Sequence, residues 1–157
     1  MIIIVTGQIC AGKSTYVKAL HNEYAAQNTP AMILELDAIG HEVLPEIMGS
    51  DVDRKELGKY VFASLKRLQK LENAMHSRIM SLARARAEEF LEQHPEGIVL
   101  IESPLPLSAS EYPWLEHAEV RVLQESYEER LNRALNRGMS AEQFELRDEI
   151  QRGYIYE

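Results

Sequence analysis

The sequence predicts a three-layer α/β fold, in which a parallel sheet lies between layers of helices. Three observations support this prediction. Short apolar runs alternate with longer segments of helical spacing, a glycine-containing loop joins the first run to the first helix, and no repeat or low-complexity linker divides the chain. A chain of 157 residues with 45% hydrophobic composition is long enough to fold around its own core. We therefore expect one domain over residues 1–157.

The expected elements begin with a buried strand. Ile2–Thr6 form an apolar, β-branched run without alternation, which is typical of a strand covered on both faces. Residues 13–27 place apolar side chains at helical spacing. Residues 28–30, Asn-Thr-Pro, end this helix, and residues 31–36 form the second strand.

A long helical segment follows the second strand. Residues 53–93 contain no proline and one glycine, and their leucines and other apolar residues recur every three or four positions. We expect two helices here, divided near residues 69–72. Residues 38–94 are therefore predicted to form a helical insertion rather than a simple crossover between strands.

The second half of the chain returns to strands. Residues 98–101 predict a third buried strand and residues 119–123 a fourth, followed by a helix over residues 127–136. Between the two strands, Tyr112 and Trp114 either form a packing cluster or line a pocket for a base.

The final helical segment has a clear start signal. Gly138 ends the preceding helix, Ser140 is in the N-cap position, and Gln143 completes a capping box. Arg130 and Arg133 recur on one face of the preceding helix among glutamates, which predicts a solvated face with salt bridges.

The loop after the first strand has the pattern of a phosphate-binding loop. Two glycines, Gly7 and Gly12, are separated by four residues and followed by Lys13 and Ser14, between a strand and a helix. Glycine allows backbone N–H groups to turn toward phosphate oxygens, and the helix directs its positive end at the same anion. Lys13 would contact the β- and γ-phosphates, and the Ser14 hydroxyl would hold Mg²⁺. The predicted nucleotide-binding residues are Gly7, Cys10, Ala11, Gly12, Lys13, Ser14 and Thr15.

Two carboxylates stand at the end of the second strand. Ligands gather at the carboxyl ends of strands in open parallel sheets, and strand alternation directs Glu35 and Asp37 to the same side. One of these carboxylates could accept the proton of a hydroxyl that attacks a γ-phosphate. Alternatively, Asp37 caps the following helix, a role that is compatible with catalysis.

Composition disfavours several classes of function. The formal net charge of −8 argues against a general nucleic-acid binder, and no apolar stretch is as long as a membrane span. A single cysteine cannot form an intramolecular disulfide, which predicts a cytoplasmic location. The strand that starts directly after Met1 leaves no room for a signal peptide.

Several stretches, in order along the chain, resemble the motifs of dephospho-coenzyme A kinases. Together with the phosphate-binding loop they run from Thr6 to Gln151. The matching stretches are Asp37–Leu44, Asp53–Gly58 with Val61 and Phe62, Leu71–His76 with Ile79, Glu102–Leu105, and Arg137–Ser140 with Arg147 and Gln151.

This resemblance implies an ATP- and Mg²⁺-dependent kinase with a P-loop kinase fold. The enzyme would phosphorylate the ribose 3′-hydroxyl of dephospho-coenzyme A, with residues 38–94 as a substrate-binding insertion and residues 137–152 as a lid. By position, Glu35 replaces the catalytic aspartate of the family and Asp37 its companion, while Glu102 would bind Mg²⁺. The resemblance further implies that Arg137 steadies the migrating phosphoryl group. It assigns substrate contacts to His76, Arg78 and Arg54.

The chain also departs from the family pattern. Glu35 is one methylene longer than the expected aspartate, and Gln8 and Cys10 stand where the family favours glycine. Ser77 replaces the proline after His76, and the fifth strand of the family has no counterpart, which predicts a shortened relative. Two alternatives stay open: a kinase for another hydroxyl or nucleotide acceptor, and a nucleotide-binding protein without turnover. The oligomeric state and the choice between ATP and GTP are not predicted.

Overall fold

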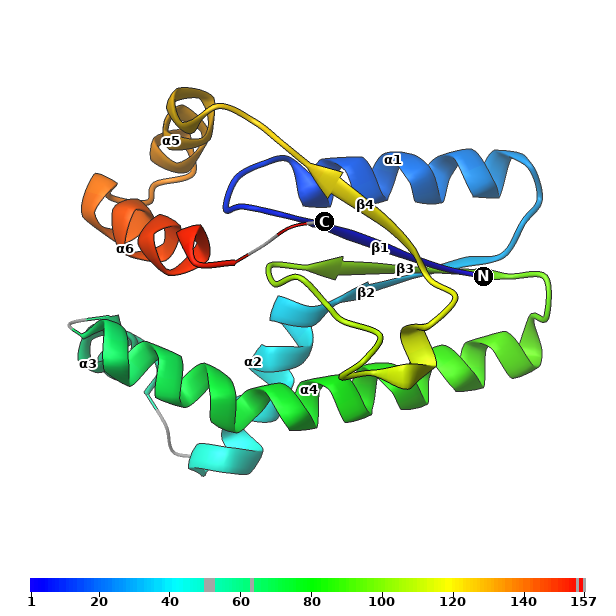
Figure 1. The fold of residues 1–157 in the computed structure, drawn as a ribbon, viewed down its shortest axis with the longest axis horizontal. Coiled ribbons are helices and arrows are strands. Elements are labelled where there is room, and N and C mark those ends of the chain that lie inside the picture. The colour runs from blue at the N-terminus through cyan, green and yellow to red at the C-terminus, as the bar shows by residue number, and fades with distance from the viewer. Residues whose placement is uncertain (50–52, 63, 155, 157) are drawn as a thin grey trace.

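A four-stranded parallel sheet forms the centre of the computed structural model, which describes residues 1–49, 53–62, 64–154 and 156 (Figure 1). The order across the sheet is β2-β3-β1-β4. Every pairing is parallel, so the predicted parallel sheet is confirmed. The strands are β1 (Ile2–Gly7), β2 (Ala31–Glu35), β3 (Ile98–Ser103) and β4 (Glu119–Leu123).

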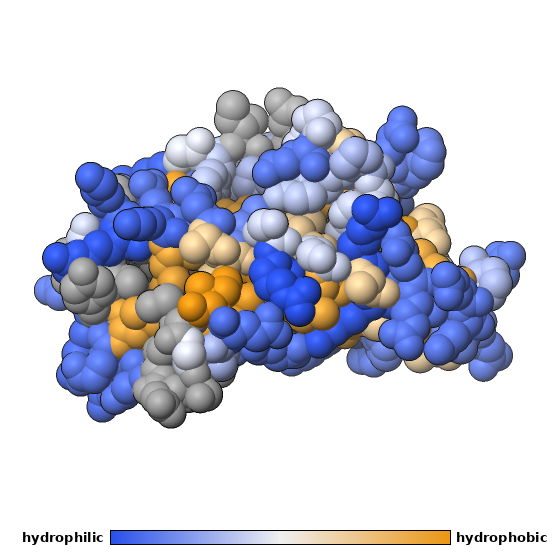
Figure 2. All heavy atoms as spheres, turned by 90° about the horizontal axis from the view of Figure 1, so that it is seen from below, coloured by the Kyte–Doolittle hydropathy of each residue, from blue (hydrophilic) through white to orange (hydrophobic). Residues whose placement is uncertain are grey.

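Different helices cover the two faces of the sheet (Figure 1). α1 (Lys13–Ala26) lies on one face, and α2 (Leu36–Met48) and α4 (Leu65–Gln93) lie on the other. Because successive strand residues point to opposite faces, Ile3 packs in a cluster with α1 and Ile4 in a cluster with α2 and α4. This arrangement confirms the predicted three-layer α/β/α architecture. Seen from the side of α4, the surface carries a band of apolar residues along its middle, interrupted by hydrophilic ones, and mostly hydrophilic residues around its edges (Figure 2).

The helices of the predicted insertion divide at a different place from the one expected. α3 (Arg54–Phe62) ends before Ser64, and α4 runs without a break through residues 69–72, so the prediction of a division there was wrong. Residues 69–72 contain neither glycine nor proline, whereas the Ser64 side chain caps α4 by accepting a hydrogen bond from the Arg67 amide at 3.5 Å. Although α4 has 29 residues, none of the described helices is apolar enough over a sufficient length to span a membrane.

Two further helices lie beyond the carboxyl ends of the strands (Figure 1). α5 (Tyr127–Asn136) has the predicted bounds, and α6 (Ala141–Arg152) starts at the predicted capping box. The Ser140 hydroxyl accepts from the Gln143 amide at 3.1 Å, and the Gln143 side chain accepts from the Ser140 amide at 3.0 Å. Gly138 between the helices has a φ of 86°, a left-handed conformation that favours glycine. A short 3₁₀ helix, η1 (Pro113–Leu115), precedes β4.

The junction between β2 and α2 differs from the sequence prediction. β2 ends at Glu35, which occupies the N-cap position, and the helix begins at Leu36. Asp37 therefore lies in the first turn of α2 and is not the helix cap. Leu36 is only 5% exposed and belongs to the core cluster, so the chain turns into the helix as soon as this side chain is buried. Strand alternation consequently does not relate Glu35 to Asp37.

Loss of the capping box should destabilise the fold measurably. We expect Ser140→Ala to lower the free energy of unfolding by about 1 kcal/mol, because the Gln143 amide loses its side-chain acceptor. Urea denaturation followed by circular dichroism would measure the change. Ser77→Ala, which removes an exposed hydroxyl inside α4, is the control. Equal stability of Ser140→Ala and the wild type would contradict the expected role of the cap.

Candidate active site

The loop between β1 and α1 has the backbone shape that a phosphate group requires. Gly7 and Gly12 have φ values of 148° and 96°, and Cys10 also has a left-handed φ, of 59°. A Cβ at Gly7 would lie 2.5 Å from the Leu123 carbonyl oxygen of β4, so only glycine fits there. None of the described side chains caps α1. The first amides of this helix therefore remain open to an anion.

Lys13 folds back over this loop. Its Nζ donates hydrogen bonds to the Gly7 carbonyl at 2.8 Å and the Gln8 carbonyl at 2.9 Å. Burial lowers the pKa of Lys13, and the negative charges of Glu102 and Asp37 oppose this shift. The ammonium group is therefore held inside the loop by carbonyls and carboxylates, where an anion would neutralise it further.

Ser14 and Glu102 form a polar pair beside the lysine. The Ser14 hydroxyl donates to Glu102 Oε1 at 2.7 Å, whereas Glu102 Oε2 is buried with no hydrogen-bond partner among the described residues. Burial raises the pKa of Glu102, the Ser14 hydrogen bond lowers it, and the charge of Glu35 on the adjacent strand raises it again. A buried carboxylate oxygen without a partner requires an explanation, and a divalent cation provides one.

The donor set at this position fits Mg²⁺. Within residues 1–49, 53–62, 64–154 and 156, no group of three or more His, Cys, Asp or Glu side chains could hold a metal ion. Mg²⁺ does not need such a cluster, because it commonly takes one or two protein oxygens and completes its octahedron with phosphate and water. Ser14 and Glu102 offer that number of oxygens.

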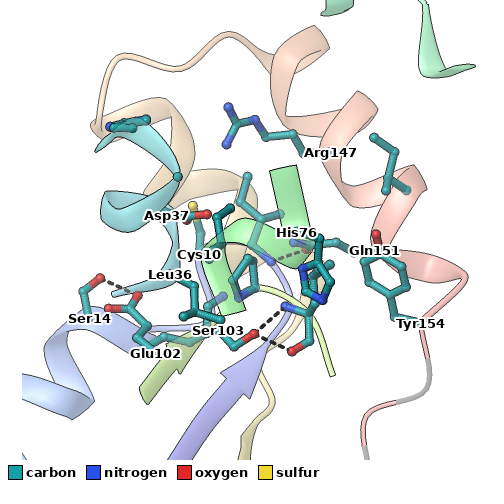
Figure 3. A pocket seen from close by; sticks show the side chains of 18 of the residues that line it. Cys10, Ser14, Leu36, Asp37, His76, Glu102, Ser103, Arg147, Gln151 and Tyr154 are labelled. Atoms are coloured by element: carbon teal, nitrogen blue, oxygen red, sulfur yellow. Dashed lines mark hydrogen bonds between the residues drawn. The ribbon is translucent and has the colours of Figure 1, made fainter. Parts of the chain in front are cut away.

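A cavity of about 500 Å³ opens at this pair and extends to the segment that joins α5 to α6 and to α6 itself. Figure 3 shows Ser14 and Glu102 on one side and, on the other, Arg147 and Gln151 of α6 with Tyr154 just beyond the helix. The predicted site residues that line the cavity are Cys10, Lys13, Ser14, Asp37, His76, Glu102 and Arg137. Sequence reasoning did not single out Tyr154, and nothing in its local sequence marks it as a lining residue.

The two carboxylates at the end of β2 have different positions. Glu35 pairs in register with Glu102 of β3 and does not line the cavity. Asp37, carried into the first helical turn, does line it and is exposed there. The start of α2 at Leu36 explains the difference, because it directs the next carboxylate toward the loop.

The predicted substrate-binding residues are not all brought together. His76 of α4 lines the cavity. Arg78 is exposed, donates from Nε to Glu46 at 2.9 Å and does not line it. Thr15, which was predicted to bind the nucleotide and not the acceptor, is exposed on α1 and is not among the lining residues. The side chain of Arg54 lies outside the described part of the chain.

Helices α5 and α6, named the lid helices after the lid predicted at residues 137–152, contact the backbone of the phosphate-binding loop directly. The Ile9 amide donates to Gln151 Oε1 at 2.5 Å, and the Ile9 carbonyl accepts from Arg130 Nη1 at 3.5 Å. The next carbonyl, of Cys10, accepts from Arg133 Nη1 at 3.1 Å. Side chains from both lid helices therefore hold two successive residues of the loop.

Arg130 is buried, contrary to the solvated position that the sequence predicted. Its Nη1 lies 2.6 Å from Asp148 Oδ1, and the two side chains are 4% and 2% exposed. The other Asp148 oxygen accepts from Arg152 at 3.0 Å. Phe144 of α6 is fully buried with its ring beside the Arg130 guanidinium, because α6 folds back over α5. Arg133 is partly exposed and pairs with Glu125 at 3.1 Å, as expected.

A comparison with protein families agrees with this geometry. The model of the dephospho-CoA kinase family matches residues 1–152. The chain belongs to the dephospho-CoA kinase family. This confirms the resemblance inferred from the sequence motifs.

Individual members of the dephospho-CoA kinase family are moderately similar. The protein named dephospho-CoA kinase from Dehalococcoides mccartyi is 30% identical over 160 aligned positions, covering 90% of this chain and 76% of the relative. Its namesake from Syntrophus aciditrophicus is 29% identical over 118 residues, covering 64% and 48%. The chain spans about half the length of the relatives from Syntrophus aciditrophicus and Moorella thermoacetica.

A solved structure supports the fold. TT1252 from Thermus thermophilus superposes with a TM-score of 0.61 and 28% sequence identity, covering 96% of this chain and 79% of that protein. Nearly the whole chain therefore has a structural counterpart.

The buried pair in the lid should be strongly coupled. We expect Arg130→Met to lower the free energy of unfolding by about 3 kcal/mol, because Asp148 would keep a buried charge with one partner fewer. The double variant Arg130→Met with Asp148→Leu should recover most of this loss. Urea denaturation of the single and double variants gives the coupling energy. Strictly additive losses would contradict the expected coupling.

Glu102 should make the stability of the protein depend on pH. Because burial raises the pKa of Glu102 above its ordinary value, the stability of the wild type falls as pH rises from the ordinary value through the raised one. Glu102→Gln lacks this charge. At pH values above the raised pKa of Glu102, we therefore expect the variant to have a higher melting temperature than the wild type. The advantage should disappear below the ordinary glutamate pKa. Thermal unfolding of both proteins at several pH values measures this difference in melting temperature. A Glu102→Gln variant that is less stable than the wild type at alkaline pH would contradict the argument from burial.

Proposed function

We propose that this protein transfers the γ-phosphate of ATP to the ribose 3′-hydroxyl of dephospho-CoA. One observation carries the proposal: a single cavity is lined by Lys13 of the phosphate-binding loop, the Ser14–Glu102 pair and the Asp37 carboxylate. These are the groups that phosphoryl transfer to an alcohol needs. The name shared by the relatives supports the choice of acceptor.

The nucleotide would bind through the loop and the start of α1. Amides of the loop would face the β- and γ-phosphates, and Lys13 Nζ would exchange its two loop carbonyls for phosphate oxygens. Ser14 and Glu102 would hold Mg²⁺, which, when bound, neutralises charge on the phosphate oxygens. The protein itself contributes the fixed geometry of the loop and the exclusion of water by the lid.

Asp37 would accept the proton of the attacking hydroxyl. Its carboxylate lines the cavity and is close enough to Lys13 for its charge to raise the pKa of that lysine. A base at this position lies beside the phosphate that Lys13 would bind. Glu35, which does not line the cavity, would act through its charge on Glu102.

Arg137 would stabilise the migrating phosphoryl group. It follows α5, is exposed and lines the cavity, and its Nη1 lies 3.9 Å from Cys10 Sγ in the phosphate-binding loop. An arginine that reaches the phosphates from a lid neutralises charge in the transition state. The cytoplasmic location inferred from the single cysteine remains a prediction, as does the lack of a nucleic-acid partner.

The acceptor can be tested directly. The protein would be incubated with Mg²⁺, ATP and a panel of dephospho-CoA, nucleosides and nucleotides, and the products separated by chromatography. We expect turnover of dephospho-CoA on the order of 1 to 100 per second. Transfer to a different acceptor would replace the proposed substrate. Tight ATP binding without transfer to any acceptor would instead indicate a nucleotide-binding protein.

Two carboxylate variants distinguish the proposed base from its neighbour. Asp37→Asn should lower kcat by about 10²- to 10⁴-fold, because the attacking hydroxyl loses its proton acceptor. Glu35→Gln should lower kcat far less than Asp37→Asn does, and Lys13→Ala should abolish transfer. Steady-state kinetics would measure each, with Asn22→Ala on the exposed side of α1 as the control. A larger loss in Glu35→Gln than in Asp37→Asn would reverse the assignment of the base.

A further inference from the structure

A second cavity, of about 540 Å³, lies between α4 and the segment that leads into η1. On the α4 side it is lined by small polar residues, and on the opposite side by aromatic and apolar ones. Examples are Asn73, Ser77 and Ser81 of α4 and Tyr112, Pro113 and Trp114 of the facing segment.

His76 marks the boundary between the two cavities. It lines both of them, and its ring makes an edge contact with Tyr112, with centroids 5.6 Å apart and planes at 69°. Burial lowers the pKa of His76, which favours a neutral ring that can both donate and accept a hydrogen bond. His76 is the residue shared by the two sets of lining residues, so the two cavities adjoin at its ring.

The second cavity is shaped for an extended chain. Asn73, Ser77 and Ser81 are spaced by four residues, so they form a row along one face of α4. With Arg84 the row covers about 16 Å at a rise of 1.5 Å per residue. Met80, which is only 2% exposed, provides an apolar surface beside this row.

The charges of the two cavities differ. The first is lined by three basic residues, Lys13, Arg137 and Arg147, against two carboxylates, Asp37 and Glu102. This excess of positive charge suits phosphates. The second contains one arginine and one glutamate, Arg84 and Glu111, whose formal charges cancel. Each is already bonded, since Arg84 donates to Glu88 at 2.7 Å and Glu111 accepts from the Tyr112 hydroxyl at 3.0 Å. The second cavity therefore matches an uncharged ligand with amide and methyl groups better than another phosphate.

We propose that the second cavity binds the pantetheine arm of the acceptor, a neutral chain with two amides and a geminal dimethyl group. The inference rests on the proposed function. The arm leaves the reacting ribose through the diphosphate, so the charged part would stay in the first cavity and the neutral part would pass His76. Asn73, Ser77 and Ser81 would hydrogen-bond the amides, and Trp114 would pack against the methyl groups.

Kinetics with a full and a truncated acceptor test this assignment. The truncated acceptor is the methyl ester of ADP, which keeps the ribose and both phosphates but lacks the arm. We expect wild-type kcat/KM to be at least about tenfold higher for dephospho-CoA than for the ester, because binding energy from the arm is lost. Ser81→Trp, which fills the cavity, should remove that preference and leave KM for ATP unchanged. Ala85→Trp, on an exposed position one turn further along α4 and outside the cavity, is the control.

The outcomes separate this inference from the proposed function. Equal kcat/KM of the wild type for both acceptors, or an equal loss for both in Ser81→Trp, would refute the second cavity as the arm site. If Ser81→Trp does not fold, Trp114→Ala should show the same selective loss for dephospho-CoA. Transfer to neither acceptor would refute the proposed function. In that case, calorimetry would measure the affinity of both acceptors for the wild type and for Ser81→Trp. A preference for dephospho-CoA that is present in the wild type and lost in Ser81→Trp would support the second cavity as the arm site, and its absence from the wild type would refute it.

Discussion

The geometry of the site depends on how the lid holds the backbone of the phosphate-binding loop. Gln151 accepts from the Ile9 amide, and Arg130 and Arg133 donate to the carbonyls of Ile9 and Cys10. These bonds join residues separated by more than a hundred positions in the sequence, so the conformation of the loop is coupled to the packing of α5 and α6. The buried charge of Arg130 is in turn neutralised by Asp148 of α6. Lid packing and the phosphate-binding conformation are thus one structural unit.

The same region concentrates charges that cost stability in the absence of a ligand. Lys13 is buried with a lowered pKa. Glu102 is half-buried with a raised pKa, and its buried Oε2 has no partner among the described residues. Each shift means that the charged form is poorly solvated in the folded protein. A cation would give Glu102 Oε2 a partner, and an anion would give the Lys13 ammonium, which now bonds two neutral carbonyls, an opposite charge. Buried or half-buried charges of this kind lower stability, and they are common at active sites.

Much of the fold follows from local sequence patterns, whereas the site depends on tertiary packing. Residues 119–123 and 127–136 have the predicted bounds because periodicity and capping residues determine them locally. Asp37 faces the cavity because burial of Leu36 starts the helix early, which no local signal indicates. The burial of Arg130 was unpredictable for a similar reason. Its partner Asp148 lies on another helix, and the sequence cannot distinguish it from the solvated acids around it.

Cys10 gives the loop a built-in tendency to relax. A side chain held at a left-handed φ of 59° costs on the order of 1–3 kcal/mol, and part of what offsets this cost is the bond from Arg133 to the Cys10 carbonyl. If α5 swings away, that bond breaks and the peptide can rotate toward an unstrained conformation. The position of α5 and the backbone conformation at Cys10 are therefore coupled, so a displacement of this helix would be felt as a change in the shape of the loop.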